Sequence, residues 1–345
     1  MKLYQDNGYV NIKAIKELNL PFNFIVGGRG TGKTYTALKE QYESGEMFML
    51  MRRTQTQLDT IGRKDFSPFK SLNRDLKINV GIVQVSKYNG AFYNMVEGEK
   101  PGTYVPQGLP IGYTCALSTV ANLRGFDAQD VQTLIYDEFI PEHHERPIKN
   151  EGQAFLNAYE TINRNRELFG KKPLTVLALA NANDLANPLF LELGIATKAE
   201  KMIKNGKEMS IDERRGIGLF MLQNSPVSRE KRKTALYRLT ENSDFTTMSI
   251  DNIFAHDTGS IIASSNLKQY KPVVAIGELC IYKHKANRHY YCSSHISGAP
   301  ELFGSGDIER RRFARAYSWL WLEYLSRNVV FESQLCEKLL TKYLN

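Results

Sequence analysis

The chain has 345 residues, of which 42% are apolar and 24% are charged, a composition typical of a globular protein. No apolar run approaches the roughly 20 residues that a membrane helix needs, and residues 1–20 lack the apolar core of a signal peptide. The net charge of +8 fits a polyanionic partner without requiring one. Scattered cysteines argue against a disulfide framework: Cys115, Cys280, Cys292 and Cys336.

Apolar runs alternate with helical patterns through the first 225 residues. The predicted strands cover residues 22–27, 46–53, 112–118, 131–140 and 173–183. Near-continuous apolar runs separated by helices predict an α/β fold with a mostly parallel sheet that is buried on both faces. The last strand is expected to lie beside the strand that carries Asp137.

An insertion rich in Gly, Tyr and Asn separates the second and third predicted strands. Residues 85–110 have turn signals at Asn89-Gly90 and at residues 98–102, which predict a protruding hairpin. After residue 225 the pattern changes to a short basic helix (228–239), a β-meander (271–296) and two helices (306–328 and 331–344). We therefore predict two domains, residues 1–225 and a small α+β domain at 259–345.

The sequence GGRGTGKT matches the phosphate-binding pattern G-x-x-x-x-G-K-[ST], between a predicted strand and a predicted helix. In such a loop the backbone amides surround the phosphates, the lysine reaches their β and γ oxygens, and the hydroxyl ligates Mg²⁺. The alternative is a glycine-rich turn with an accidental lysine. The predicted nucleotide-binding residues are Gly27, Gly28, Arg29, Gly30, Thr31, Gly32, Lys33 and Thr34. Of these, Thr34 is also the predicted Mg²⁺ ligand.

Asp137 and Glu138 follow an apolar strand about 100 residues after the loop. An aspartate in this position completes the Mg²⁺ shell, and the following glutamate polarises the attacking water. With the intervening strand, the pair favours the P-loop ATPases that have an additional strand and a catalytic glutamate. The alternative for Glu138 is an ordinary surface carboxylate.

Arginine and asparagine side chains supply further candidates. Arg164 or Arg166 in "NRNRE" fits an arginine that acts on the γ-phosphate of a neighbouring subunit, or both are solvated charges. Asn181 and Asn183 end the fifth strand and fit a sensor of the γ-phosphate, or a turn. A zinc site in the meander is not expected, because its spacings match no common ligand pair: Cys280, His284, His289, Cys292 and His295.

The quoted motifs, with "MRRT", "LRGFDAQDVQTLIYDEFI", "ANANDLANP" and "SREKRKTALYRL", resemble those of the genome-packaging ATPases of small protein-primed podophages, a terminase-like group. The resemblance implies an additional-strand catalytic-glutamate (ASCE) ATPase that hydrolyses ATP with Mg²⁺. It implies a homomeric ring, expected to be a pentamer, that moves double-stranded DNA through the portal of an empty capsid. It also implies a protein of the bacterial host cytoplasm that binds the prohead transiently and is absent from the mature virion.

By position, the resemblance makes Lys33 and Thr34 ligands of phosphate and Mg²⁺, Asp137 a Mg²⁺ ligand, Glu138 catalytic and Arg164 the arginine finger. It further implies a helical linker at residues 226–258 and a C-terminal domain like an inactive ribonuclease-H-type nuclease. Two departures limit it. Thr54 and Gln55 stand where the family continues with a basic residue, and the C-terminal strands offer only the carboxylate of Glu278, which predicts no nuclease activity.

A translocase needs an electrostatic, sequence-tolerant grip on DNA. The candidate contacts, each of which alternatively is a solvated charge, are Arg63, Lys64, Lys70, Lys87 and Lys100. A basic cluster at Arg310, Arg311 and Arg312 fits binding to the portal, to DNA or to a structural packaging RNA.

Two other functions fit the same motifs. One is a different ring ATPase, such as a helicase or remodelling ATPase, and the other is a nucleotide-dependent switch. Arg29 either acts across the site, holds a neighbouring carboxylate, or is a solvated charge.

Overall fold

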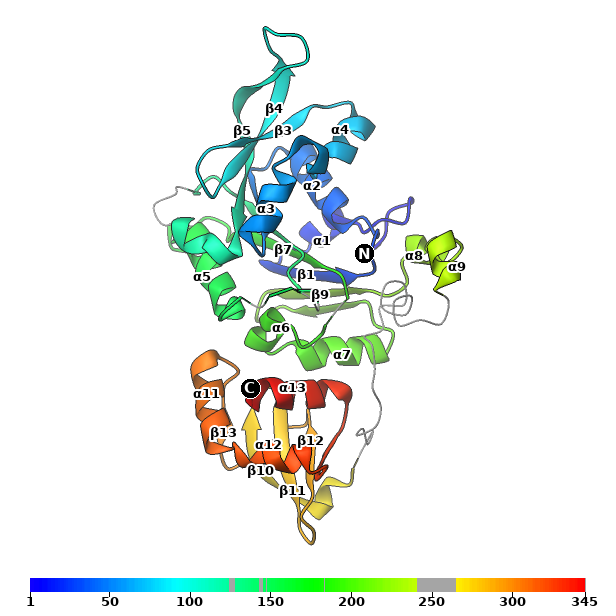
Figure 1. Ribbon diagram of the computed structural model, residues 1–345, viewed down its shortest axis with the longest axis vertical. Helices are drawn as coiled ribbons and strands as arrows, with labels where there is room; N and C mark the ends of the chain where they lie inside the picture. Colours follow the sequence, from blue (N-terminus) through cyan, green and yellow to red (C-terminus); the bar gives the residue numbers. More distant parts are fainter. Residues whose placement is uncertain (124–127, 143–144, 147, 183, 241–264, 345) are drawn as a thin grey trace. The chain divides into compact units, whose positions relative to one another are not determined.

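A computed structural model describes residues 1–123, 128–142, 145–146, 148–182, 184–240 and 265–344 (Figure 1). The chain forms two compact units. The larger comprises Met1–Ile148, Ala154–Asn183 and Gly206–Ile253, and the smaller comprises Lys149–Gln153, Asp184–Asn205 and Phe254–Asn345. This division differs from the continuous domain predicted for residues 1–225, because residues 184–205 group with the C-terminal residues.

The larger unit is built on a nine-stranded sheet with the order β3-β4-β5-β2-β6-β7-β1-β9-β8. From β5 to β9 every neighbouring pair is parallel, which confirms the predicted parallel core. All five predicted strands are present. The strands are β1 Phe22–Gly27, β2 Phe48–Arg52, β3 Val80–Gln84, β4 Gly90–Glu97, β5 Tyr104–Ala116, β6 Thr133–Asp137, β7 Thr175–Ala180, β8 Met209–Asp212 and β9 Ile217–Leu222.

Strand β7 lies between β1 and β6 and pairs with both in parallel. Val26 of β1 is level with Ala180, and Asp137 of β6 is level with Leu179. The carboxyl ends of the three strands therefore meet at one edge of the sheet. Open parallel sheets place their ligand sites at such an edge.

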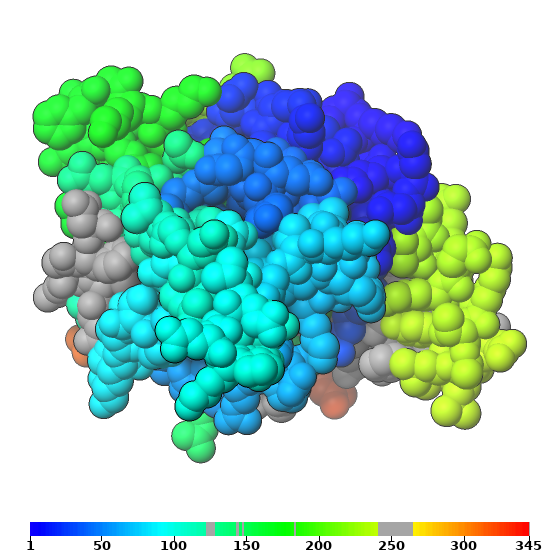
Figure 2. Space-filling model, turned by 90° about the horizontal axis from the view of Figure 1, so that it is seen from above, coloured from blue at the N-terminus to red at the C-terminus, as the bar shows by residue number. Residues whose placement is uncertain are grey.

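The predicted insertion is an antiparallel extension of the same sheet. Strands β3, β4 and β5 form a meander whose turns lie at residues 85–89 and 98–103, close to the predicted turns. Figure 2 looks onto this part of the unit and shows the cyan surface of the meander exposed. Along β5 the exposed apolar side chains include Tyr104, Val105 and Leu109.

The β8–β9 hairpin was not predicted. β9 is a fully buried run of six residues next to β1, so its apolar sequence carried the signal of a central strand. Helices connect the strands of this unit, and α2 packs against β6 and β7. The helices are α1 Ile12–Lys16, α2 Lys33–Ser44, α3 Gln55–Ile61, α4 Lys70–Leu76, α5 Glu151–Asn163, α8 Pro226–Lys231 and α9 Ala235–Leu239.

The smaller unit contains a five-stranded sheet with the order β13-β10-β11-β12-β14. The first three strands in chain order, β10, β11 and β12, form the predicted antiparallel meander. The helix predicted at residues 306–328 is two helices, since α11 ends at Ala316 and α12 begins at Trp319. The elements are α6 Pro188–Leu193, α7 Ala196–Lys204, β10 Tyr270–Ile276, β11 Leu279–His284, β12 Tyr290–Ser293, β13 Leu302–Phe303, α11 Asp307–Ala316, α12 Trp319–Leu325, β14 Val329–Phe331 and α13 Gln334–Leu344.

The linker predicted at residues 226–258 begins with α8 and α9, and residues 241–258 lie outside the described part of the chain. Within the described residues, none of the helices has the length and apolar character needed to cross a membrane.

A buried aromatic cluster joins the meander to the parallel core. The Phe92 ring of β4 lies 5.3 Å from the Phe48 ring of β2 and 5.2 Å from the Phe69 ring, measured between ring centroids. Phe92→Ala should lower the free energy of unfolding by about 3–5 kcal/mol, since it removes a fully buried ring from a packed cluster.

Urea denaturation followed by circular dichroism measures this loss. Leu109→Ala is the control, because Leu109 is 85% exposed on the same meander and its truncation should cost less than about 0.5 kcal/mol. Equal unfolding midpoints for the two variants would contradict the role given to the cluster.

Candidate nucleotide-binding site

The loop between β1 and α2 has the geometry of an anion-binding turn. Gly30 and Gly32 have φ angles of 77° and 78°, a conformation that side-chain-bearing residues rarely adopt. Gly32 is the N-cap of α2, so the positive end of the helix dipole faces the loop. The predicted phosphate loop is therefore placed as the sequence pattern requires, at the carboxyl end of β1.

The Lys33 ammonium lies inside this turn. It donates to the carbonyl oxygens of Gly27 and Gly28, both at 2.9 Å, and to Thr31 Oγ1 at 3.3 Å. Burial lowers the pKa of Lys33 to about 7, although the Asp137 carboxylate acts in the opposite direction. A buried ammonium held by neutral carbonyls is available to compensate the charge of a phosphate.

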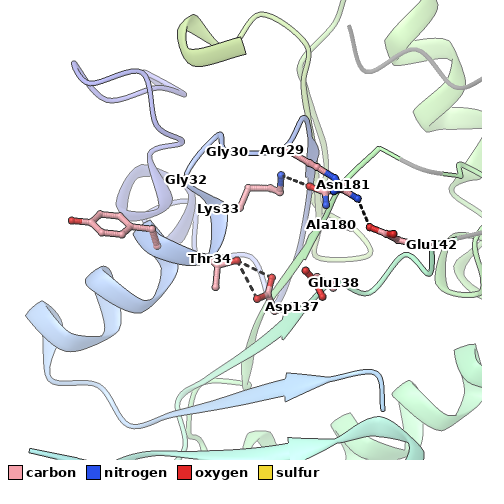
Figure 3. Close-up of a pocket in the computed structure, with 11 residues that line it drawn as sticks. Arg29, Gly30, Gly32, Lys33, Thr34, Asp137, Glu138, Glu142, Ala180 and Asn181 are labelled. Carbon is pink, nitrogen blue, oxygen red and sulfur yellow. Dashed lines mark hydrogen bonds and ion pairs between the residues drawn. The ribbon is translucent and has the colours of Figure 1, made fainter. Parts of the chain in front are cut away.

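The structure brings Thr34 and Asp137 together at the foot of the same pocket. Thr34 Oγ1 donates to Asp137 Oδ1 at 2.9 Å and to Oδ2 at 3.1 Å (Figure 3). Burial raises the pKa of the Asp137 carboxyl, and the Arg52 guanidinium opposes that shift. A hydroxyl and a carboxylate beside a phosphate-binding loop are hard oxygen donors of the kind that Mg²⁺ takes together with phosphate and water, so the donor set fits this ion.

Arg52, at the end of β2, was not predicted to belong to the site. Its Nη2 lies 2.8 Å from Asp137 Oδ2, and its Nη1 donates to Glu138 Oε2 at 2.5 Å. The "MRR" that ends the strand was visible in the sequence, but its function was not, because only the β2–β6 pairing brings it beside the acidic pair.

Glu138 follows β6 with a φ of 59°, unusual for a residue with a side chain. Its side chain is 51% exposed, whereas that of Asp137 is 4% exposed. The positive φ turns the chain sharply after the buried aspartate. Asp137 is thus enclosed, as suits a residue that ligates a metal ion. The Glu138 carboxylate instead faces the pocket, where a water molecule has access.

Arg29 forms an ion pair with Glu142. Both side chains line the pocket, which has a volume of about 410 Å³ and is bordered by the loop, β6 and β7 (Figure 3). Of the roles predicted for Arg29, holding a neighbouring carboxylate matches this contact, and the carboxylate is that of Glu142.

Asn181 directly follows β7 and lines the same pocket, and its Oδ1 accepts a hydrogen bond from Lys33 Nζ at 3.3 Å. It therefore lies where a sensor of the nucleotide is expected. Asn183, the second predicted asparagine, lies outside the described residues.

The two arginines of "NRNRE" differ in their environment. Arg166 is 8% exposed and donates to the carbonyl oxygens of Ala128 and Gln129 at 2.9 and 3.1 Å, so it is held within the fold. Arg164 is exposed at the end of α5 with a φ of 50°. Asn163 bonds to Leu174, just before β7, whereas the pocket lies at the other end of that strand. A six-residue strand spans about 17–20 Å, so Arg164 cannot reach the pocket of its own chain.

Thr54 and Gln55 lie at the start of α3. The Thr54 side chain caps this helix together with Gln57 in a capping box. The position where the family continues with a basic residue therefore begins a helix here. Next to it, the fully buried Arg53 pairs with Glu145 at 2.6 Å, and Glu145 also accepts a hydrogen bond from Gln57.

The remaining candidates lie outside the pocket. The predicted DNA contacts are all exposed: Arg63, Lys64, Lys70, Lys87 and Lys100. Within the described residues, no group of three or more His, Cys, Asp or Glu side chains lies close enough to hold a metal ion. Glu278 accepts hydrogen bonds from the amides of Ala196 and Thr197 at 2.9 and 3.1 Å, so it binds the start of α7.

Two curated relatives are DNA packaging proteins of Bacillus phages. The protein of phage B103 is 27% identical over 245 residues, which cover 70% of this chain and 66% of the relative. The protein of phage phi29 is 26% identical over 241 residues, which cover 68% of this chain and 63% of the relative. The chain thus spans slightly less than two thirds of the length of these relatives.

Solved structures with the same fold include the Phi-28 gp11 DNA packaging motor, with a TM-score of 0.60 and 20% identity over 98% of this chain and 97% of that one. The bacteriophage Phi-29 viral genome packaging motor assembly gives a TM-score of 0.59 and 18% identity over 98% and 99%. At this identity the likeness concerns the fold. The profile of the Podovirus DNA encapsidation protein (Gp16) family matches residues 5–282, more than half of the chain, and the chain belongs to this family.

Proposed function

We propose that the protein is an ATP-hydrolysing motor that moves double-stranded DNA into an empty capsid as a homomeric ring at the portal. The observation that carries the proposal is the convergence of Lys33, Thr34, Asp137 and Glu138 on one pocket. Membership of the encapsidation family supports the DNA substrate and the portal as partner. The curated relatives are named DNA packaging proteins, which agrees.

The order of the strands supports the additional-strand catalytic-glutamate class. β7 separates the phosphate-loop strand β1 from β6, and a glutamate follows the aspartate of β6. In this class the aspartate and the glutamate have different tasks, and the exposure of the two side chains fits that division. We assign Asp137 to the Mg²⁺ shell and Glu138 to the attacking water.

In the proposed reaction the loop amides and Lys33 bind the polyphosphate of ATP. Thr34 and Asp137 would hold Mg²⁺, which would neutralise negative charge on the phosphate oxygens. Glu138 orients a water molecule for in-line attack and accepts its proton. Arg52 contacts both carboxylates and thereby reduces the electrostatic repulsion between them.

Arg164 is proposed to act on the nucleotide of a neighbouring subunit. It is exposed, and the length of β7 separates it from its own pocket. A ring, expected to be a pentamer, would bring Arg164 to the site of the next subunit, where an arginine stabilises the charge that develops on the phosphates.

A structural packaging RNA is a further candidate partner. The smaller unit, with its five-stranded sheet, is proposed to be a nuclease-like domain without activity.

Glu138→Gln should leave ATP binding within about threefold of wild type and lower DNA-stimulated hydrolysis by about 10²–10⁴-fold, since the amide cannot accept the proton. Binding of a fluorescent ATP analogue and release of phosphate measure the two effects. Glu97→Gln, on the exposed end of β4, is the control. Undiminished hydrolysis by Glu138→Gln would contradict the catalytic role of Glu138, and with it the motor assignment that rests on this role.

Arg164→Ala subunits mixed with wild-type subunits should lower ATPase activity more steeply than in proportion to their fraction, because each variant subunit disables a neighbour's site. Phosphate release across a mixing series measures this dependence. Lys172→Ala, an exposed change in the same connection, should give no such loss. A strictly proportional decline with Arg164→Ala would rule out action between subunits.

The affinity for DNA should fall as the salt concentration rises, since binding to DNA phosphates releases counterions. Changing both Arg63 and Lys64 to Gln should reduce the slope of log affinity against log salt by about 0.9 per lost phosphate contact. Filter binding of duplex DNA over a salt series gives the slope. Lys2→Gln, at a residue paired with Asp6, serves as the control. An unchanged slope in the double variant would remove these two residues from the DNA interface.

A further inference from the structure

Helix α8 lies in the larger unit, before the chain passes for the last time to the smaller unit, and its start lies against the N-terminal residues. The Ser225 hydroxyl contacts the Gly8 carbonyl at 3.5 Å, and a Cβ at Gly8 would lie 3.0 Å from the Val227 side chain. Figure 2 shows the yellow-green residues of α8 and α9 beside the blue N-terminal residues. The amide of Val10 in turn donates to Thr31 of the phosphate loop at 3.0 Å, so α8 is fixed beside that loop.

The last residue of α8 reaches the crest of the loop. Lys231 Nζ donates to the backbone carbonyl of Arg29 at 2.5 Å. A side chain at Gly30 would overlap the Lys231 ammonium. Glycine at position 30 thus serves both the turn and the close approach of a second lysine.

The charge of Lys231 acts on the phosphate-binding space. It lowers the pKa of Lys33, and its effect on that pKa exceeds the effect of Arg29. Burial and the nearby Arg29 lower the pKa of Lys231 itself. Arg29 is paired with Glu142, whereas within the described part of the chain the Lys231 ammonium has no carboxylate partner. A partly buried cation among other cations is stabilised when a polyanion binds between them.

We propose that Lys231 is a second phosphate-binding lysine, which α8 presents to the polyphosphate of the nucleotide from the same chain. The inference rests on the proposed ATP site and adds a residue to it that no loop or strand motif contains. Bound phosphate then joins the crest of the loop, α2 and α8. Because α8 precedes the segment that leads to the smaller unit, the contact makes the start of that segment sensitive to the nucleotide.

Equilibrium titration with a fluorescent ATP analogue tests the contact. Lys231→Gln should weaken binding by about tenfold or more, the usual effect of losing one charge-assisted hydrogen bond. Lys231→Arg keeps the charge and should retain most of the affinity. The matched control is Lys233→Gln, since Lys233 belongs to the same basic cluster but its side chain is 74% exposed and paired with Glu230. Its affinity should stay within about twofold of wild type.

Hydrogen exchange of residues 226–240 provides a second measurement. In the wild type, the ATP analogue should slow exchange in this segment, and in Lys231→Gln it should not, even at a concentration that saturates the variant. If Lys231→Gln only destabilised this segment, hydrogen exchange would change by the same amount in the absence and in the presence of the nucleotide.

Wild-type affinity in Lys231→Gln would overturn the proposal, as would an equal loss in Lys233→Gln. A wild-type protein that binds no ATP analogue would instead refute the nucleotide site, and the proposal with it. These results separate the failure of the Lys231 contact from the failure of the proposed function.

Discussion

The site depends on the parallel pairing of β7 with β1 on one side and β6 on the other. This pairing sets Ala180 level with Val26 and Leu179 level with Asp137, so the residues after all three strands meet at one edge. The hydrogen bond between Thr34 and Asp137, at 2.9 Å, joins residues that are 103 positions apart in the chain. A shift in the register of β7 would separate the phosphate loop from the acidic pair.

Among the residues that the structure describes, the charged side chains of this site have polar partners. Arg52 lies between the carboxylates of Asp137 and Glu138, Arg29 pairs with Glu142, and the Lys33 ammonium is held by backbone carbonyls. An unpaired buried charge would cost several kcal/mol, on the order of the stability of a whole domain. Lys33, like Lys231, donates to neutral backbone carbonyls, so it can gain a phosphate without giving up a carboxylate.

Two arginines separated by one residue show how local structure divides tasks. Arg166 is drawn into the fold by two backbone carbonyls, and its removal would leave those groups unsatisfied. Arg164 occupies the left-handed turn that ends α5 and remains exposed. The same sequence motif therefore contains one residue that is buried and stabilises the fold, and one that is exposed on the surface.

The sequence by itself determined the phosphate loop, the five parallel strands, the turns of the meander and the acidic pair after β6. These features depend on local patterns, namely apolar runs, turn residues and the fixed spacing of a loop that must wrap a phosphate. Only the tertiary structure decided the places of Arg52, Glu142 and Lys231, because strand order and helix packing bring them from distant segments to the loop. The tertiary structure likewise assigned residues 184–205 to the smaller unit. The sequence could not do so, because apolar periodicity predicts a helix but not the element against which it packs.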